Sequence, residues 1–160
     1  MKRSLSFTIV LFAASCAAYD GAGLRTGAST EADVRSAMGM PALELRDPDG
    51  SRHYYYPRGP LGHQTFVADI GNDGVLREIR GVLSDGNFNR IRPGLTAAEI
   101  LRLIGPPREK AHFERLGQTA WDYKFVDTWG YSSILSVMLD RDDVVVGKVT
   151  RRIERYERGD

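Results

Sequence analysis

Cysteine, histidine and long apolar runs are all scarce in this sequence. Cys16 is the only cysteine among 160 residues, so no disulfide can form within one chain. The three histidines are accompanied by no phosphate loop, nucleophile elbow, paired-cysteine or metalloprotease motif. The formal net charge of +1 gives no electrostatic reason to expect nucleic acid as a partner. These absences predict a protein that is not an enzyme, holds no metal and acts on no small-molecule substrate.

The longest apolar run lies near the start of the chain, over residues 5–14, shortly after Lys2 and Arg3. A membrane-spanning helix needs roughly 20 apolar residues, so this run is too short to cross a bilayer. A short apolar run behind positive charges is typical of a cleavable export signal. We therefore predict a signal peptide over residues 1–15.

The small residues around Cys16 indicate which kind of export signal this is. The sequence Ala13-Ala14-Ser15-Cys16 resembles a lipobox, in which a bacterial lipoprotein is lipidated on its cysteine and cleaved before it. An ordinary secretory signal, cut after Ala17 or Ala18, is the alternative. On the lipobox interpretation, residues 16–23 are a lipidated tether, and a multiply acylated cysteine anchors permanently. Ala17 in place of aspartate resembles the sorting signal for the outer membrane, facing the periplasm.

The rest of the chain contains one pattern written twice, and the two copies are predicted to span residues 24–85 and 86–160. The offset between the copies is 66 residues at three kinds of position: a threonine, a glycine and a proline. The corresponding pairs are Thr30 and Thr96, Gly39 and Gly105, and Pro41 and Pro107. A sequence that repeats at a fixed interval predicts a structural unit that is also repeated.

Each copy begins with a predicted helix of about eight residues. Thr30 with Asp33, and Thr96 with Glu99, match a capping box, in which side chains satisfy free backbone groups at a helix start. The glycine and proline that follow each helix are typical of a helix end. Such short helices are marginal alone, so we expect each to be held against a sheet.

Strand patterns follow the helix in both copies. Trp121, Tyr123 and Phe125 alternate with polar residues, and Tyr54 and Tyr56 occupy comparable places in the first copy. Residues 66–70 and 134–139 read as the next strands, and each is followed by a tight turn and a last strand. We therefore predict an α+β fold of two tandem modules. Each is a short helix, or a helix pair, packed on a three- to four-stranded antiparallel sheet. Two units this small are expected to share an interface.

The second copy resembles the SmpA/OmlA family of BamE-like lipoproteins. The resemblance rests on the run from Ile91 to Thr96, the glycine and prolines at residues 105–107, the aromatic strand at residues 121–123 and the final hairpin around residues 139–144. It implies a non-catalytic outer-membrane lipoprotein that serves as an accessory or scaffold subunit in the assembly of β-barrel proteins. Its partners would be envelope proteins.

The duplication departs from that family, whose members carry one module. A paired arrangement is similar to the β-lactamase inhibitory proteins, in which two such modules present a joint surface to a partner. The alternative prediction is therefore a periplasmic protein-binding or enzyme-inhibitory protein.

Two aromatic residues are the candidate partner-binding residues. Trp129 and Tyr131 flank a glycine between two predicted strands, and exposed aromatic residues often dominate binding interfaces. The competing interpretation is that one or both fold back onto the core. His53 is expected to pack at a strand edge, and His63 to face solvent. The acidic residues at 140–143 read as a solvated hairpin turn rather than a calcium site.

Overall fold

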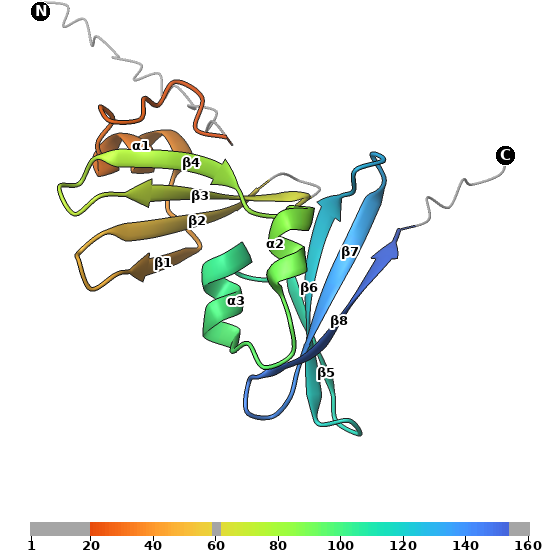
Figure 1. Ribbon diagram of the computed structural model, residues 1–160. Coiled ribbons are helices and arrows are strands. Elements are labelled where there is room, and N and C mark those ends of the chain that lie inside the picture. The colour runs from red at the N-terminus through yellow and green to blue at the C-terminus, as the bar shows by residue number, and fades with distance from the viewer. Residues whose placement is uncertain (1–19, 59–61, 154–160) are drawn as a thin grey trace, which may run out of the picture.

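The computed structural model describes residues 20–58 and 62–153, which form two four-stranded antiparallel sheets and three short helices (Figure 1). Sheet 1 has the strands β1 (Leu43–Arg46), β2 (Arg52–Arg58), β3 (Gln64–Ile70) and β4 (Leu76–Gly81), in that order. Sheet 2 has the strands β5 (Glu109–Phe113), β6 (Gln118–Val126), β7 (Ser132–Leu139) and β8 (Val145–Arg152), also in order. The helices are α1 (Glu31–Met38), α2 (Asp85–Arg90) and α3 (Ala97–Ile104). The predicted two-module α+β fold is confirmed.

Helices α1 and α3 are built alike, as the repeat predicts. Each has eight residues, begins with a complete capping box on Thr30 or Thr96, and ends at a glycine. The N-termini are also tied to the last hairpin of their own module. The N–H of Glu31 donates to the carbonyl of Gly74, and the N–H of Ala97 donates to that of Asp143. Helix α2 precedes α3 in module 2, whereas residues 20–29 of module 1 form turns and no helix.

Each helix covers the face of its own sheet that carries the predicted aromatic residues. In module 1 the core gathers Val34 and Met38 from α1 with Tyr54 and Tyr56 from β2. In module 2, residues of α2 and α3 pack on the aromatic side chains of β6. The buried residues of this second core are Leu83, Phe88, Ile91, Ile100, Ile104, Trp121, Tyr123, Phe125, Leu135, Val137, Leu139 and Val145.

The opposite face of sheet 1 is buried as well, which the sequence does not predict. Tyr55 points away from Tyr54 and Tyr56, yet all three are at most 1% exposed. Tyr55 packs instead with Val67 and Val82 in a third apolar cluster. Successive strand residues face opposite sides, so three consecutive buried tyrosines require a cover on both faces. Helices α2 and α3, which lie between the two sheets in Figure 1, belong to module 2 and provide the second cover.

The corresponding face of sheet 2 has no such apolar centre. Asp122 and Ser136 are cross-strand partners there, and the serine hydroxyl donates to the carboxylate at 2.6 Å. They take the places that Tyr55 and Val67 hold in sheet 1, where those two residues are also cross-strand partners. Sheet 1 is therefore an inner layer, whereas sheet 2 keeps a partly polar outer face.

The first described residues already lie against module 1. Gly21 is buried, and a Cβ at this position would collide with Ile79 of β4. The predicted signal peptide, Cys16 and residues 16–19 of the predicted tether lie outside the described residues, as do residues 154–160. The boundary predicted between residues 85 and 86 falls at the start of α2. Within the described residues, no helix combines the length and the apolar character needed to span a membrane.

Candidate protein-binding surface

The two modules meet where the end of α3 rests on the face of sheet 1 that carries Tyr55, opposite the face covered by α1. The hydroxyl of Tyr55 donates to the backbone carbonyl of Arg102 at 2.6 Å. Gly105, directly after α3, packs closely against sheet 1. A Cβ at this position would lie 2.8 Å from a ring carbon of Tyr55 and 3.0 Å from Thr65. The hydroxyl of Tyr123 donates to the carbonyl of Gly105 at 3.1 Å, which fixes this segment from the other side. The predicted shared interface between modules is therefore present.

His53 lies in a polar network at the edge of this contact. Its Nδ1 is 2.6 Å from Asp69 and its Nε2 is 2.8 Å from Asp47. Asp47 also accepts from Arg102 of α3 at 2.5 Å, so the network joins the two modules. Burial alone would lower the pKa of His53, but its hydrogen bonds to the two aspartates outweigh burial and raise the pKa. Both ring nitrogens are occupied, so His53 is a structural link and offers no free nitrogen to act as a base.

His63 does not simply face solvent, and that expectation is wrong. It lies at the module junction, partly buried, with Nε2 3.2 Å from the hydroxyl of Ser132 at the start of β7. Burial lowers the pKa of His63, and the nearby charges of Lys124 and Arg108 lower it further. The expectation failed because the sequence does not show that His63, just before β3, reaches the other module.

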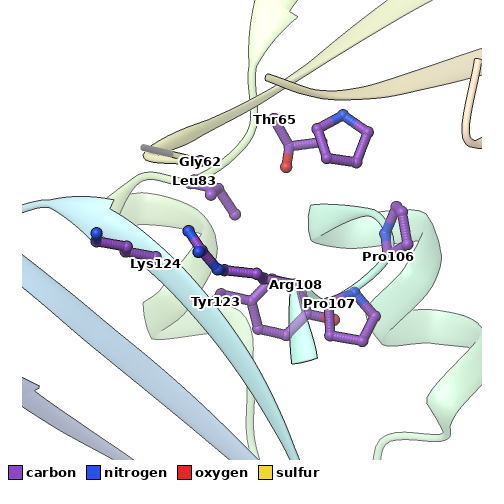
Figure 2. Close-up of a pocket in the computed structure, with 9 residues that line it drawn as sticks. Gly62, Thr65, Leu83, Pro106, Pro107, Arg108, Tyr123 and Lys124 are labelled. Atoms are coloured by element: carbon purple, nitrogen blue, oxygen red, sulfur yellow. The ribbon is translucent and has the colours of Figure 1, made fainter. Parts of the chain in front are cut away.

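A cleft of about 340 Å³ opens at the same junction (Figure 2). Thr65 and Gly62 of module 1 form one wall, and Tyr123 and the segment from Pro106 to Arg108 of module 2 form the other. None of its described lining residues is a carboxylate, histidine or cysteine. The full lining is Pro57, Gly62, Thr65, Leu83, Pro106, Pro107, Arg108, Tyr123 and Lys124. The cleft therefore lacks an acid–base pair or a metal-ligand set.

The acidic residues at 140–143 form the predicted hairpin turn. Asp140 accepts the backbone N–H groups of Asp142 and Val144 at 2.9 and 3.0 Å. Asp143 has φ of 58°, at the position where the first module has Gly74 with φ of 77°. Among the described residues, no group of three or more histidine, cysteine, aspartate or glutamate side chains could hold a metal ion.

Trp129 and Tyr131 lie on the loop between β6 and β7, and both face solvent. Trp129 is 74% exposed and Tyr131 is 56% exposed, so neither folds back onto the core. We call residues 127–131 the aromatic loop. A tryptophan exposed to this extent is uncommon, because the free energy falls when its indole ring is moved out of water.

Asp127 holds the aromatic loop in shape. One carboxylate oxygen accepts the backbone N–H groups of Trp129 at 3.0 Å and Tyr131 at 2.9 Å. The other oxygen accepts from Nε of Arg152, on the last strand, at 3.0 Å. Partial burial would raise the pKa of Asp127, but the N–H of Tyr131 and the guanidinium of Arg152 outweigh burial and lower the pKa. The carboxylate is thus kept ionised, and the loop is tied to β8.

Arg152 also lies against both aromatic rings. Its guanidinium carbon is 5.0 Å from the centre of the Trp129 ring and 4.5 Å from that of Tyr131. Such cation–π contacts favour a fixed arrangement of the three side chains. The two exposed rings and the cation therefore form one preorganised cluster, which we call the aromatic–arginine cluster.

A groove of about 420 Å³ adjoins this cluster, between α2 and the β6, β7 and β8 strands. Phe88, Phe125 and Leu135 provide its apolar part, and the rings of Phe88 and Phe125 meet edge to face at 4.7 Å. The full lining is Asp85, Phe88, Asn89, Phe125, Asp127, Thr128, Trp129, Ser133, Leu135, Lys148, Thr150 and Arg152. We call this hollow the α2–β8 groove.

The sequence indicates part of this surface. The two aromatic residues beside a glycine identify the loop, but Arg152 is 21 positions beyond Tyr131 and was interpreted as part of a solvated strand end. The antiparallel pairing of β7 with β8, which sets Ser133 opposite Arg152, brings the cation to the loop. The α2–β8 groove depends on α2, whose six residues give little periodicity to recognise.

Comparisons with known proteins give few matches. No protein-family model matches the chain, and no curated protein matches it significantly. Two solved structures resemble it distantly. A DUF4309 family protein (YjgB) of Bacillus subtilis has 20% identity and a TM-score of 0.33, with 83% of this chain and 84% of that one covered. A putative β-lactamase inhibitor protein of Streptococcus mutans has 9% identity and a TM-score of 0.32, with 77% and 82% covered. The SmpA/OmlA resemblance stays a prediction, because no protein-family model matches the chain.

Proposed function

We propose that this chain is a non-catalytic protein that binds other proteins through the aromatic–arginine cluster and the α2–β8 groove. The observation that carries the proposal is the 74% exposure of Trp129 on a loop whose backbone is already fixed by Asp127. Exposed tryptophan, tyrosine and arginine side chains are the residues most often found at the centre of protein interfaces. The inhibitory form of this function, in which the partner is an enzyme, corresponds to the alternative prediction from the sequence.

The preorganisation of the cluster supports binding rather than a purely structural role. A flexible aromatic side chain loses roughly 0.5–1.5 kcal/mol of conformational freedom when a partner immobilises it. Here the contacts of Arg152 with both rings, and the bonds of Asp127 to the loop, restrict that freedom before binding. None of these contacts adds to a core. Their arrangement is the kind expected of a binding surface with a low ordering cost.

Replacement of Trp129 tests this proposal. The chain would carry a photo-crosslinking amino acid at position 128, next to Trp129, and cross-linked proteins would be identified from cells of the source organism. We expect Trp129→Ala to lower the yield of the specific cross-link at least tenfold. Met40→Ala is the matched control, because Met40 is 75% exposed but lies on module 1. An unchanged cross-link pattern in Trp129→Ala would refute the proposed surface.

We also propose that the chain is exported, lipidated on Cys16 and held at the outer membrane. The apolar run behind Lys2 and Arg3, and the small residues before Cys16, support this. Cys16→Ser should abolish incorporation of radiolabelled palmitate and shift the protein out of the membrane fraction. If the serine variant fractionates with membranes as the wild type does, the lipid anchor is wrong.

Two partner classes remain open within this proposal, and one pull-down separates them. The tagged, lipidated chain is solubilised in detergent and its bound proteins are identified, with an unrelated lipoprotein as the control. Recovery of β-barrel assembly subunits would support the BamE-like scaffold role that the sequence resemblance implies. Recovery of a single periplasmic enzyme, inhibited by the purified chain, would support the inhibitory role.

A further inference from the structure

Arg152 has hydrogen-bonding capacity that the fold leaves unused. Its Nε donates to Asp127, whereas its two terminal nitrogens have no acceptor among the described residues. Its side chain is 52% exposed. A guanidinium can donate two parallel hydrogen bonds to one carboxylate, and this pairing is strongest when the guanidinium is already oriented. The contacts with Trp129 and Tyr131 provide that orientation.

Lys148 is a second cation in the lining of the α2–β8 groove, beside Arg152. Lys148 projects from the same face of β8 and donates to the backbone carbonyl of Phe88 in α2. Burial lowers the pKa of Lys148, and the charge of Arg92 lowers it further. No carboxylate of the described residues forms a salt bridge with Lys148 or Arg92. The groove lining also holds two acids, Asp85 and Asp127, of which Asp127 is already committed to the loop and to Arg152.

The floor of the α2–β8 groove is apolar beside these cations. Phe88, Phe125 and Leu135 line it, together with Trp129 and Lys148. An occupant that satisfied only the cations would leave this apolar surface in contact with water. A purely apolar occupant would leave the terminal nitrogens of Arg152 without a hydrogen-bond acceptor. The lining therefore fits a segment that carries an acidic residue next to an apolar one.

We infer that the partner presents such a segment, with an aspartate or glutamate carboxylate paired to the terminal nitrogens of Arg152 and a neighbouring apolar side chain in the α2–β8 groove. This inference rests on the proposed binding function and names the chemistry of the partner. Asp127 is a positioning residue in it, because it holds the arginine without contacting the partner. The contact is selective for charge, since a glutamine in place of the glutamate cannot form the ionic pair.

A peptide array with charge-matched pairs tests the inference. Each twelve-residue peptide combines apolar residues with glutamate, and its twin carries glutamine at the same positions. We expect the full chain to bind the best glutamate peptides at least tenfold more tightly than their twins. Arg152→Gln should remove this difference, and Arg152→Lys should reduce it, because lysine keeps the charge but lacks the planar fork.

Arg151→Gln is the matched control. Arg151 is the neighbouring cation on the same strand, but its cross-strand partner is Ile134, so it projects from the opposite face of sheet 2. We expect this variant to keep the preference for glutamate. The inference is overturned if twins bind equally, if no peptide binds, or if Arg151→Gln and Arg152→Gln lose the same affinity.

The outcome for this inference can be told apart from the outcome for the binding function. If Trp129→Ala abolishes the cross-link to a partner protein but the twins bind equally, the surface binds proteins without selecting acidic segments. If Trp129→Ala leaves the cross-link intact, the proposed surface itself is wrong, whatever the peptides show. Thermal unfolding of each variant confirms that the fold is retained.

Discussion

Gly39 and Gly105 have the same backbone conformation and different surroundings. Each ends a helix with φ close to 80°, and the N–H of each donates to the carbonyl four residues earlier. Any other residue is strained in this region of φ and ψ, at a cost of roughly 1–3 kcal/mol. Around Gly39 there is open space, whereas Gly105 is in contact with Tyr55 and Thr65 of module 1.

We therefore expect Gly105→Ala to destabilise the protein more than Gly39→Ala does. Both variants incur the backbone strain, but only Gly105→Ala adds a methyl group to a closed interface, at a further cost of about 1–3 kcal/mol. Urea unfolding of the two variants measures the difference. Equal losses of stability would mean that the module interface accommodates the added methyl group, which would contradict the close approach of Gly105 to Tyr55 and Thr65.

At the residue scale, sequence reasoning succeeded where the chemistry is local. The capping threonines and terminal glycines act on their own helix, so their neighbours in the chain are sufficient to identify them. It failed for Tyr55, because the alternation that correctly buries Tyr54 and Tyr56 predicts that Tyr55 faces water. Its burial comes from a helix that lies about fifty residues away in the chain.

The carboxylate of Asp127 links the aromatic loop to β8. Asp127→Ala should leave the sheets intact but release Trp129, because the loop loses two backbone hydrogen bonds and its tie to Arg152. Fluorine NMR of chain labelled with 5-fluorotryptophan would show this as a narrower Trp129 signal. The buried Trp121 provides an internal reference.

Asp140→Ala is the control for this element. Asp140 likewise accepts two backbone N–H groups within its turn, but at the opposite end of β7. It should leave the Trp129 signal unchanged. A Trp129 signal that stays broad in Asp127→Ala would show that the cation–π contacts alone order the loop.

At the element scale, the first strand of each sheet, β1 or β5, could not be predicted, whereas the other three strands could. Strands β2, β3, β6 and β7 carry strong apolar patterns, because their side chains enter a core. Strand β5 is exposed along its whole length, so its sequence shows no alternation to detect. The same reason explains why only the aromatic half of the binding surface could be predicted.

At the scale of the whole molecule, folding changes the pKa values of two histidines at the module interface in opposite directions. The pKa of His53 is raised from 6.5, so its contribution to stability is complete below pH 6.5 and is lost as the pH rises through the folded pKa. The pKa of His63 is lowered from 6.5, so its contribution is lost as the pH falls below 6.5. Stability should therefore pass through a maximum near neutral pH.

Each histidine should account for one side of that maximum. We expect His53→Gln to flatten the decline of the unfolding free energy between pH 6.5 and 9. His63→Gln should instead flatten the decline between pH 6.5 and 5. Urea unfolding across this range measures both. If His53→Gln retains the alkaline decline of the wild type, the network with Asp47 and Asp69 does not link protonation to folding.

The double-sided burial of sheet 1 gives the two copies different freedom to vary. Every position of the central part of β2 is constrained by an apolar core, on one face or the other, whereas alternate positions of β6, such as Asp122 and Lys124, are only half-buried and lie in no apolar core. A substitution that β6 tolerates will therefore often prevent folding when it is made at the corresponding position of β2. The contact with module 2 thus constrains sheet 1 at positions whose counterparts in sheet 2 lack that constraint. This accounts for a repeat whose helix ends still match while its central strands have diverged.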